Sequence, residues 1–163
     1  MDQHQDELAR VDRRFEERAL RRLEPAIRAG ELDLVLIHDA ARPLCSPELV
    51  ATLVCAAATG GGAVPGLVVD DLAAIAEDGT LAPLAGRHVR IQTPQIFAAV
   101  PLLEAYHRAA EVGFEGTDTA ACLERFSTLK VTYIPGEEQN FKITYPHDVA
   151  LADELIRRRD THG

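Results

Sequence analysis

The sequence predicts an α/β domain built on a parallel sheet, and three features support that fold class. The apolar run from Leu34 to Ile37 is typical of a strand buried on both faces. A predicted helix at 46–59 leads into a second apolar run at 63–69, which completes the βαβ unit of a parallel sheet. Hydrophobic residues make up 47% of the 163 residues and charged residues 26%, which suits one globular domain.

Residues 1–30 form a charged segment ahead of the α/β domain expected over 31–163. Its apolar residues recur at steps of three and four, which predicts a helix. Pro25 should kink or interrupt it, so we expect a frayed first part and a short second helix that ends at Gly30. The arginines of this segment could bind phosphates, although alternating charge usually marks a solvated helix face.

Ser46 and Pro47 predict the start of the helix at 46–59, because a serine hydroxyl caps free amides and proline is tolerated in the first turn. Gly60, Gly61 and Gly62 then end the helix. The triple glycine is not followed by Lys-Ser/Thr and precedes a strand, so it is interpreted as a helix stop and not as a phosphate cradle.

Residues 70–87 predict a protruding β-arm. Asp78-Gly79 is a strong hairpin-turn signal between two short apolar pieces. A free arm would expose four apolar side chains, which favours a partner surface: Leu72, Ile75, Leu81 and Leu84.

The remaining chain alternates between short strands and helices. We expect a helix that starts soon after Gln95, includes Phe97 and ends near Gly113, and another that begins at Thr117, a natural N-cap. Strands are expected at 129–134 and 141–144, the latter carrying Lys142, and a last helix begins at Pro146.

Charge and cysteine content exclude several function classes. Lys plus Arg number 17 against 26 Asp plus Glu, a formal charge of −9 that argues against a nucleic-acid or anionic-membrane footprint. The cysteines Cys45, Cys55 and Cys122 are odd in number and widely spaced, which predicts reduced thiols. With neither an apolar run long enough for a membrane span nor a signal segment, we expect a cytoplasmic protein.

Asp39 and Arg42 follow directly on the first predicted strand. In open α/β sheets ligands bind beyond the carboxyl ends of strands, where a carboxylate can hold a divalent cation and a guanidinium can bind a phosphate. The residue types equally allow a local ion pair between Asp39 and Arg42 that closes a turn before Pro43.

The order of these residues resembles a known family. His38-Asp39-Ala40-Ala41-Arg42-Pro43 is similar to the signature of the 2-C-methyl-D-erythritol 4-phosphate cytidylyltransferases, which join CTP to a polyol phosphate in isoprenoid precursor synthesis. Further similar motifs follow in the family's order: 61–65, Gln92-Thr93-Pro94-Gln95 with Phe97, Thr117-Asp118, and 140–144 with Pro146 and Asp148.

The resemblance implies a Rossmann-like nucleotidyltransferase sheet and a role for each matching residue. Asp39 would hold Mg²⁺ and, with Ala40, contact the nucleotide. Lys142 would neutralise phosphate charge, making Asp39 and Lys142 the catalytic pair, while Arg42, Thr117 and Lys142 would bind the polyol phosphate. The arm would join two copies into a homodimer and help to wall the partner's pocket.

Two departures from the family pattern leave alternatives open. The family's N-terminal glycine-rich loop has no counterpart in residues 1–30, which contain one glycine, so we expect an N-terminally truncated domain. Leu72 stands where the family arm carries a threonine. The alternatives are a cytidylyltransferase for another sugar or polyol phosphate, such as ribitol 5-phosphate, and a catalytically inactive nucleotide-binding or dimerisation module.

Overall fold

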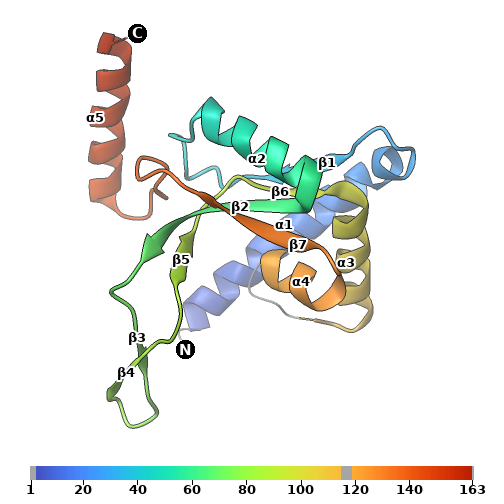
Figure 1. Cartoon of the computed structure of the whole chain (residues 1–163), viewed down its shortest axis with the longest axis horizontal. Helices are drawn as coiled ribbons and strands as arrows, with labels where there is room; N and C mark the ends of the chain where they lie inside the picture. The colour runs from blue at the N-terminus through green and yellow to red at the C-terminus, as the bar shows by residue number, and fades with distance from the viewer. Residues whose placement is uncertain (1–2, 115–118, 163) are drawn as a thin grey trace.

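The computed structural model describes residues 3–114 and 119–162 and has a five-stranded mixed sheet with a separate two-stranded hairpin (Figure 1). The helices are α1 (Gln3–Arg28), α2 (Pro47–Gly60), α3 (Ala99–Glu111), α4 (Thr119–Phe126) and α5 (Pro146–His162). The strands are β1 (Leu34–Ile37), β2 (Gly61–Val69), β3 (Ala73–Ile75), β4 (Leu81–Pro83), β5 (His88–Ile91), β6 (Gln95–Ala98) and β7 (Lys130–Pro135).

The sheet has a core on each face. On one face α1, α3 and α4 pack around Val35, Val64 and Phe97. On the other face α2 packs on Ala63 and Ile96 (Figure 1). Neighbouring residues of one strand point to opposite faces, so β1, β2 and β6 each contribute side chains to both cores.

The sheet is mixed, and the prediction of a parallel sheet is therefore wrong in part. β1 and β2 run in the same direction, as the predicted βαβ unit requires, but β6 lies between them and is antiparallel to both. β5 is also antiparallel to β2, whereas β7 pairs with β2 in parallel.

Residues 95–98 form strand β6, so the prediction of a helix that starts soon after Gln95 and includes Phe97 is wrong over these residues. Gln95, Ile96 and Phe97 are all buried, and α3 begins only at Ala99. A helix at the protein surface could not bury consecutive residues in two different cores, whereas a central strand presents Ile96 to one and Phe97 to the other.

β1 is not buried on both faces, contrary to the prediction. Val35 is buried, but Leu36 retains 46% of its exposure. Among the described strands β1 pairs only with β6, so it forms an edge of the sheet and its outer face is only partly covered.

α1 is one continuous helix, so the expected interruption at Pro25 is wrong. Pro25 has no N–H and so removes one helical bond, to the carbonyl of Arg21, but only one turn follows it, and its own carbonyl accepts from the Ala29 N–H at 3.0 Å. Ile27 is buried in the core and holds this turn in place. Gly30 follows with a positive φ of 72°, which ends the helix as predicted.

The predicted hairpin arm is confirmed. β3 and β4 pair in antiparallel register, and Gly79 adopts a φ of 82° at the turn. Figure 1 shows the hairpin extending away from the sheet. Ile75 and Leu81 keep 79% and 75% of their exposure, as expected for an arm without a partner surface in this chain.

Within the part of the chain that the structure describes, none of the helices combines the length and the apolarity that crossing a bilayer requires.

Helix α2 begins and ends as the sequence predicts. Ser46 Oγ accepts a hydrogen bond from the Leu49 N–H at 3.0 Å, and Gly61 ends the helix with a left-handed φ of 92°. The Ser46 hydroxyl also donates to the carboxylate of Glu137, which follows β7. The cap therefore attaches α2 to the segment that leads towards Lys142.

We expect Ser46→Ala to lower the free energy of unfolding by about 1 kcal/mol, because it removes both the cap and the bond to Glu137. Chemical denaturation measures this. Thr52→Ala is the matched control, since the Thr52 hydroxyl donates only to Glu48 O within the same exposed helix surface. Equal effects of the two substitutions would contradict the role of the cap.

Candidate functional site

The candidate site lies beyond the carboxyl end of β1, where two predicted residues from distant parts of the sequence meet. The Asp39 carboxylate (Oδ2) is 2.9 Å from Lys142 Nζ. Asp39 keeps 27% of its side-chain exposure and Lys142 48%, so both are accessible to a ligand. This contact brings the predicted catalytic pair together.

A tight turn over residues 39–42 fixes the direction of the Asp39 carboxylate. Its Oδ1 atom accepts from the Ala41 N–H at 2.9 Å, and the Arg42 N–H donates to the Asp39 carbonyl at 2.9 Å. One carboxylate oxygen is thereby held by the turn and the other faces Lys142. Ala40 lies within the same turn, and its nucleotide contact stays a prediction.

Arg42 lies on the inner side of the site. Its Nη1 atom donates to Asn140 O at 2.8 Å, and its Nε atom is buried without a hydrogen-bond partner among the described residues. Burial lowers the pKa of the Arg42 guanidinium, and the charge of Asp39 acts in the opposite direction. The ion-pair partner of Asp39 is Lys142, so the alternative of a local Asp39–Arg42 pair is not the arrangement that the structure describes.

Lys142 does not lie on a strand, contrary to the prediction for residues 141–144. This segment is irregular, and its backbone bond to the site runs from the Ile143 N–H to Ala41 O at 2.8 Å. The bond joins the segment to the Asp39 turn, which places the neighbouring Lys142 against the carboxylate. A single backbone bond is too little to form a strand ladder.

The buried amide side chains of Gln92 and Asn140 hold the backbone segments around the site together. The Gln92 side chain donates to Glu137 O and Asn140 O and accepts from the Glu137 N–H. Asn140 is fully buried, and its Nδ2 atom donates to Thr93 O at 2.8 Å. In the sequence, Gln92 and Asn140 stand out only as members of the motifs that resemble the family. Asn140 follows Glu138 and Gln139, so nothing in the sequence marks it as buried, and spacing does not show which carbonyls the two amides bind.

Thr117, the remaining predicted contact to the polyol phosphate, lies outside the described residues. α4 begins just after it, at Thr119.

The pKa of Asp39 is lowered from its ordinary value. Partial burial would raise the pKa of this carboxyl, but the hydrogen bonds from Lys142 and the Ala41 N–H, with the charges of Lys142 and Arg42, together outweigh it. Asp39 is therefore ionised at neutral pH, as a cation ligand must be.

Asp39 offers one carboxylate for a metal ion. Among the residues that the structure describes, no group of three His, Cys, Asp or Glu side chains could enclose one. A cation bound here would take most of its ligands from water or from a bound phosphate, which is the usual way in which proteins hold Mg²⁺ with a nucleotide.

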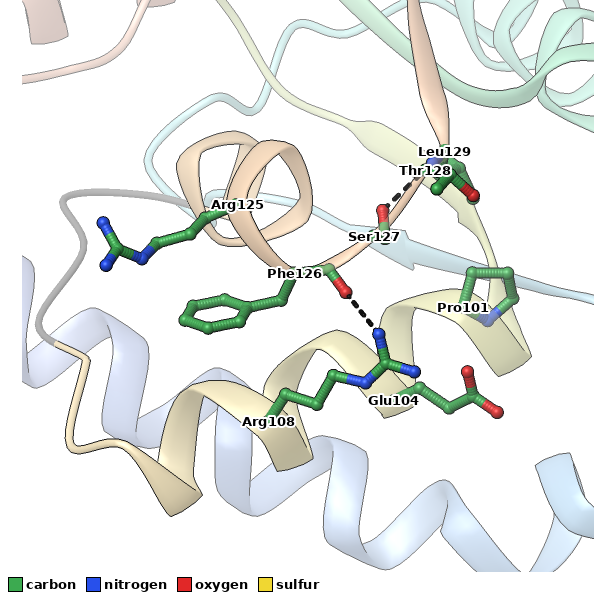
Figure 2. A pocket seen from close by; sticks show the side chains of 8 residues that line it. All are labelled: Pro101, Glu104, Arg108, Arg125, Phe126, Ser127, Thr128 and Leu129. Carbon is green, nitrogen blue, oxygen red and sulfur yellow. Dashed lines mark hydrogen bonds between the residues drawn. The ribbon is translucent and has the colours of Figure 1, made fainter.

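A hollow lies at the other end of β7, beside Leu129. It has a volume of about 580 Å³ and is lined by Pro101, Glu104, Arg108, Arg125, Phe126, Ser127, Thr128 and Leu129. Figure 2 shows the Arg108 guanidinium directed at the carbonyl of Phe126, to which it donates at 3.2 Å. None of the predicted site residues lines this hollow, so it is separate from the Asp39 site.

Comparison with known proteins identifies the family. The family model for 2-C-methyl-D-erythritol 4-phosphate cytidylyltransferase (IspD) matches residues 17–158. The chain belongs to this family. The match includes Asp39, Arg42 and Lys142, and it confirms the resemblance that the sequence motifs indicated.

Relatives in sequence and structure agree with this assignment. The chain is 41% identical over 145 residues to the 2-C-methyl-D-erythritol 4-phosphate cytidylyltransferase of Deinococcus radiodurans, covering 87% of this chain and 60% of that protein. It is 43% identical over 124 residues to the bifunctional enzyme IspD/IspF of Nitratidesulfovibrio vulgaris, covering 74% and 31%.

Solved structures of the family confirm the fold class. The crystal structure of the Thermus thermophilus cytidylyltransferase is 41% identical and superposes with a TM-score of 0.67, covering 82% of this chain and 66% of that one. The 4-diphosphocytidyl-2C-methyl-D-erythritol synthase of Anaerococcus prevotii superposes with a TM-score of 0.70 at 29% identity, covering 77% and 59%. The chain thus spans about three fifths of the length of single-activity relatives.

We expect Lys142→Met to raise the pKa of Asp39 towards its ordinary value, because the substitution removes a hydrogen bond and a positive charge. A carboxyl whose pKa is lowered by folding stabilises the fold above its unfolded pKa, and this contribution is lost as the pH falls through the lowered value. In the variant, the stabilisation that Asp39 contributes should therefore begin to disappear at a higher pH as the pH is lowered.

Titration of the Asp39 carboxyl carbon by NMR measures this shift. Lys130→Met, at the start of β7, removes an equal charge away from the site and should leave Asp39 unchanged. An Asp39 pKa that does not rise in Lys142→Met would show that the ion pair does not persist in solution.

Proposed function

We propose that this chain forms the acceptor-binding and catalytic part of a cytidylyltransferase that transfers CMP from CTP to 2-C-methyl-D-erythritol 4-phosphate and releases pyrophosphate. The observation that carries the proposal is the convergence of Asp39, Arg42 and Lys142 beyond β1, within the sequence matched by the family model. The names of the relatives support this acceptor over other sugar phosphates.

The proposed reaction requires positioned charge and no general base. An anionic oxygen of the acceptor phosphate attacks the α-phosphorus of CTP, a new P–O bond forms, and the bond to the β-phosphate oxygen breaks. Both reactants are anions, so bringing them together requires cations at fixed positions. Lys142 is the accessible ammonium for the phosphate charge, and Arg42 is the fixed guanidinium behind it.

The residues present fit Mg²⁺ as the cofactor. Asp39 would hold the ion, with its remaining ligands drawn from nucleotide phosphates and water. When bound, the ion would screen the charge of the triphosphate and stabilise the leaving pyrophosphate. The protein's own part is to keep Asp39 ionised and directed outward, which the turn at 39–42 does.

A second candidate is a nucleotide-binding module without transferase activity. Residues 3–28 are helical, so this stretch does not form the glycine-rich loop of the family pattern. Such a loop wraps a phosphate with backbone amides that a continuous helix has already used internally. Saturable CTP binding by this chain without pyrophosphate release would favour the module.

The arm and the free thiols support two further proposals. We infer a homodimer joined through the hairpin, because exposed apolar side chains of this size require a covering surface: Leu72, Ile75, Leu81 and Leu84. We also infer a cytoplasmic location, which the free thiols of Cys45 and Cys55 support, since disulfides are rare in that compartment.

We expect Asp39→Asn to lower pyrophosphate release from CTP, Mg²⁺ and the polyol phosphate by about a hundredfold or more, because the neutral amide holds a cation less strongly than a carboxylate and forms no ion pair with Lys142. The melting temperature should change little, since a partly exposed ion pair contributes little stability. Asp153→Asn on α5 is the matched control, because Asp153 is exposed and forms a long ion pair with Arg157 at 3.9 Å. A strongly destabilised Asp39→Asn would indicate a structural carboxylate instead.

We expect Ile75→Glu with Leu81→Glu to convert the homodimer to a monomer, because the proposed interface would then bury carboxylates. Sedimentation velocity measures the mass. Val112→Glu is the control, since Val112 is also well exposed but lies at the end of α3. An unaltered chain that is already monomeric at micromolar concentration, or a dimer that survives both arm substitutions, would exclude the arm as the interface.

A further inference from the structure

His38, which the proposed reaction does not use, makes two hydrogen bonds around the Asp39 turn. Its Nε2 atom is 3.1 Å from Arg42 O, and its Nδ1 atom is 3.1 Å from Thr93 Oγ1. Thr93 Oγ1 in turn accepts from the Asp39 N–H at 2.9 Å. The imidazole thus contacts the far end of the turn and, through Thr93, its beginning.

The chemistry of the partners determines which imidazole nitrogen carries the hydrogen in the neutral ring. A backbone carbonyl can only accept, so Nε2 must carry the hydrogen that goes to Arg42 O. Nδ1 of the neutral ring then accepts from the Thr93 hydroxyl, whose oxygen is left to accept from the Asp39 N–H. Every donor in this chain of bonds has one acceptor, so the neutral ring with hydrogen on Nε2 satisfies all three contacts.

Two further hydrogen bonds connect the Asp39 turn to Asn140 and connect Asn140 back to Thr93. Arg42 Nη1 donates to Asn140 O, and Asn140 Nδ2 donates to Thr93 O. Thr93 is consequently fixed through its carbonyl by a fully buried amide and through its hydroxyl by the turn. Three separate segments, 38–42, 92–93 and 140–143, are held in one arrangement.

We propose that His38 and Thr93 are positioning residues that fix the Asp39 turn, so that the carboxylate and the Arg42 guanidinium keep their relative orientation when the phosphates bind. His38 itself is exposed and contributes little to the core. Its effect is therefore on the geometry of the turn, where misplacement of a catalytic group by about 1 Å can lower the rate about a hundredfold. This consequence for catalysis rests on the proposed function, whereas the bonds themselves do not.

The first test is the tautomer of His38 in the full chain. Nitrogen NMR of the imidazole at about pH 8 should show a neutral ring with hydrogen on Nε2. A ring with hydrogen on Nδ1, or the averaged signals of a freely exchanging ring, would overturn the inference.

The second test uses paired Thr93 substitutions. Thr93→Val removes the hydroxyl and should raise the hydrogen-exchange rate of the Asp39 amide at least about tenfold, whereas Thr93→Ser should stay within about twofold of the unaltered chain. Unchanged exchange in Thr93→Val would overturn the inference. Neither this test nor the NMR test requires CMP transfer, so they decide the inference even if the proposed function fails.

The third test separates positioning from a purely structural role. His38→Leu should lower kcat for CMP transfer at least about tenfold at an unchanged melting temperature, and His38→Gln, which keeps a donor for Arg42 O, should restore part of it. His107→Leu is the matched control, because His107 is exposed and contacts Glu24 on α1. Equal kcat values in His38→Leu and His107→Leu, in a chain that transfers CMP, would overturn the positioning role.

Discussion

The site depends on two buried amide side chains, Gln92 and Asn140. Between them they bind the carbonyls of Thr93, in the connection from β5 to β6, and of Glu137 and Asn140, in the segment after β7. Asn140 is fully buried, so its carbonyl must find a donor within the protein, and the side chains of Gln92 and Arg42 supply it. These bonds also bring the segment of Lys142 beside the turn of Asp39, and the ion pair follows from that contact.

The site concentrates positive charge on an otherwise acidic protein. With a formal charge of −9, the chain has no general attraction for phosphates, so binding requires bases at particular places. The two bases are held differently. Lys142 is half exposed and paired with a carboxylate, whereas Arg42 is fixed by a buried carbonyl, and a guanidinium held in that way keeps a defined orientation.

Much of the fold could be predicted because its signals are local. Ser46 and Gly61 bound α2, Asp78-Gly79 forms the hairpin turn, and the apolar runs mark β1 and β2. The failures were where a long-range partner decides the structure. Ile96, Phe97 and Ala98 suit a helix or a strand equally, and pairing with β1 and β2 makes residues 95–98 the central strand. Pro25 does not interrupt α1, because Ile27 in the same turn is buried in the core.

The sequence by itself determined the family, the acid and bases of the candidate site and the exposed arm, because motif order, residue chemistry and turn signals are all written along the chain. Only the tertiary structure decided which base meets the acid. Arg42 is three residues from Asp39, yet the carboxylate pairs with Lys142, because the turn directs the side chain outward while Asn140 O holds the guanidinium inward. Proximity in sequence does not predict which base pairs with Asp39, because the pairing depends on hydrogen bonds between segments that only folding brings together.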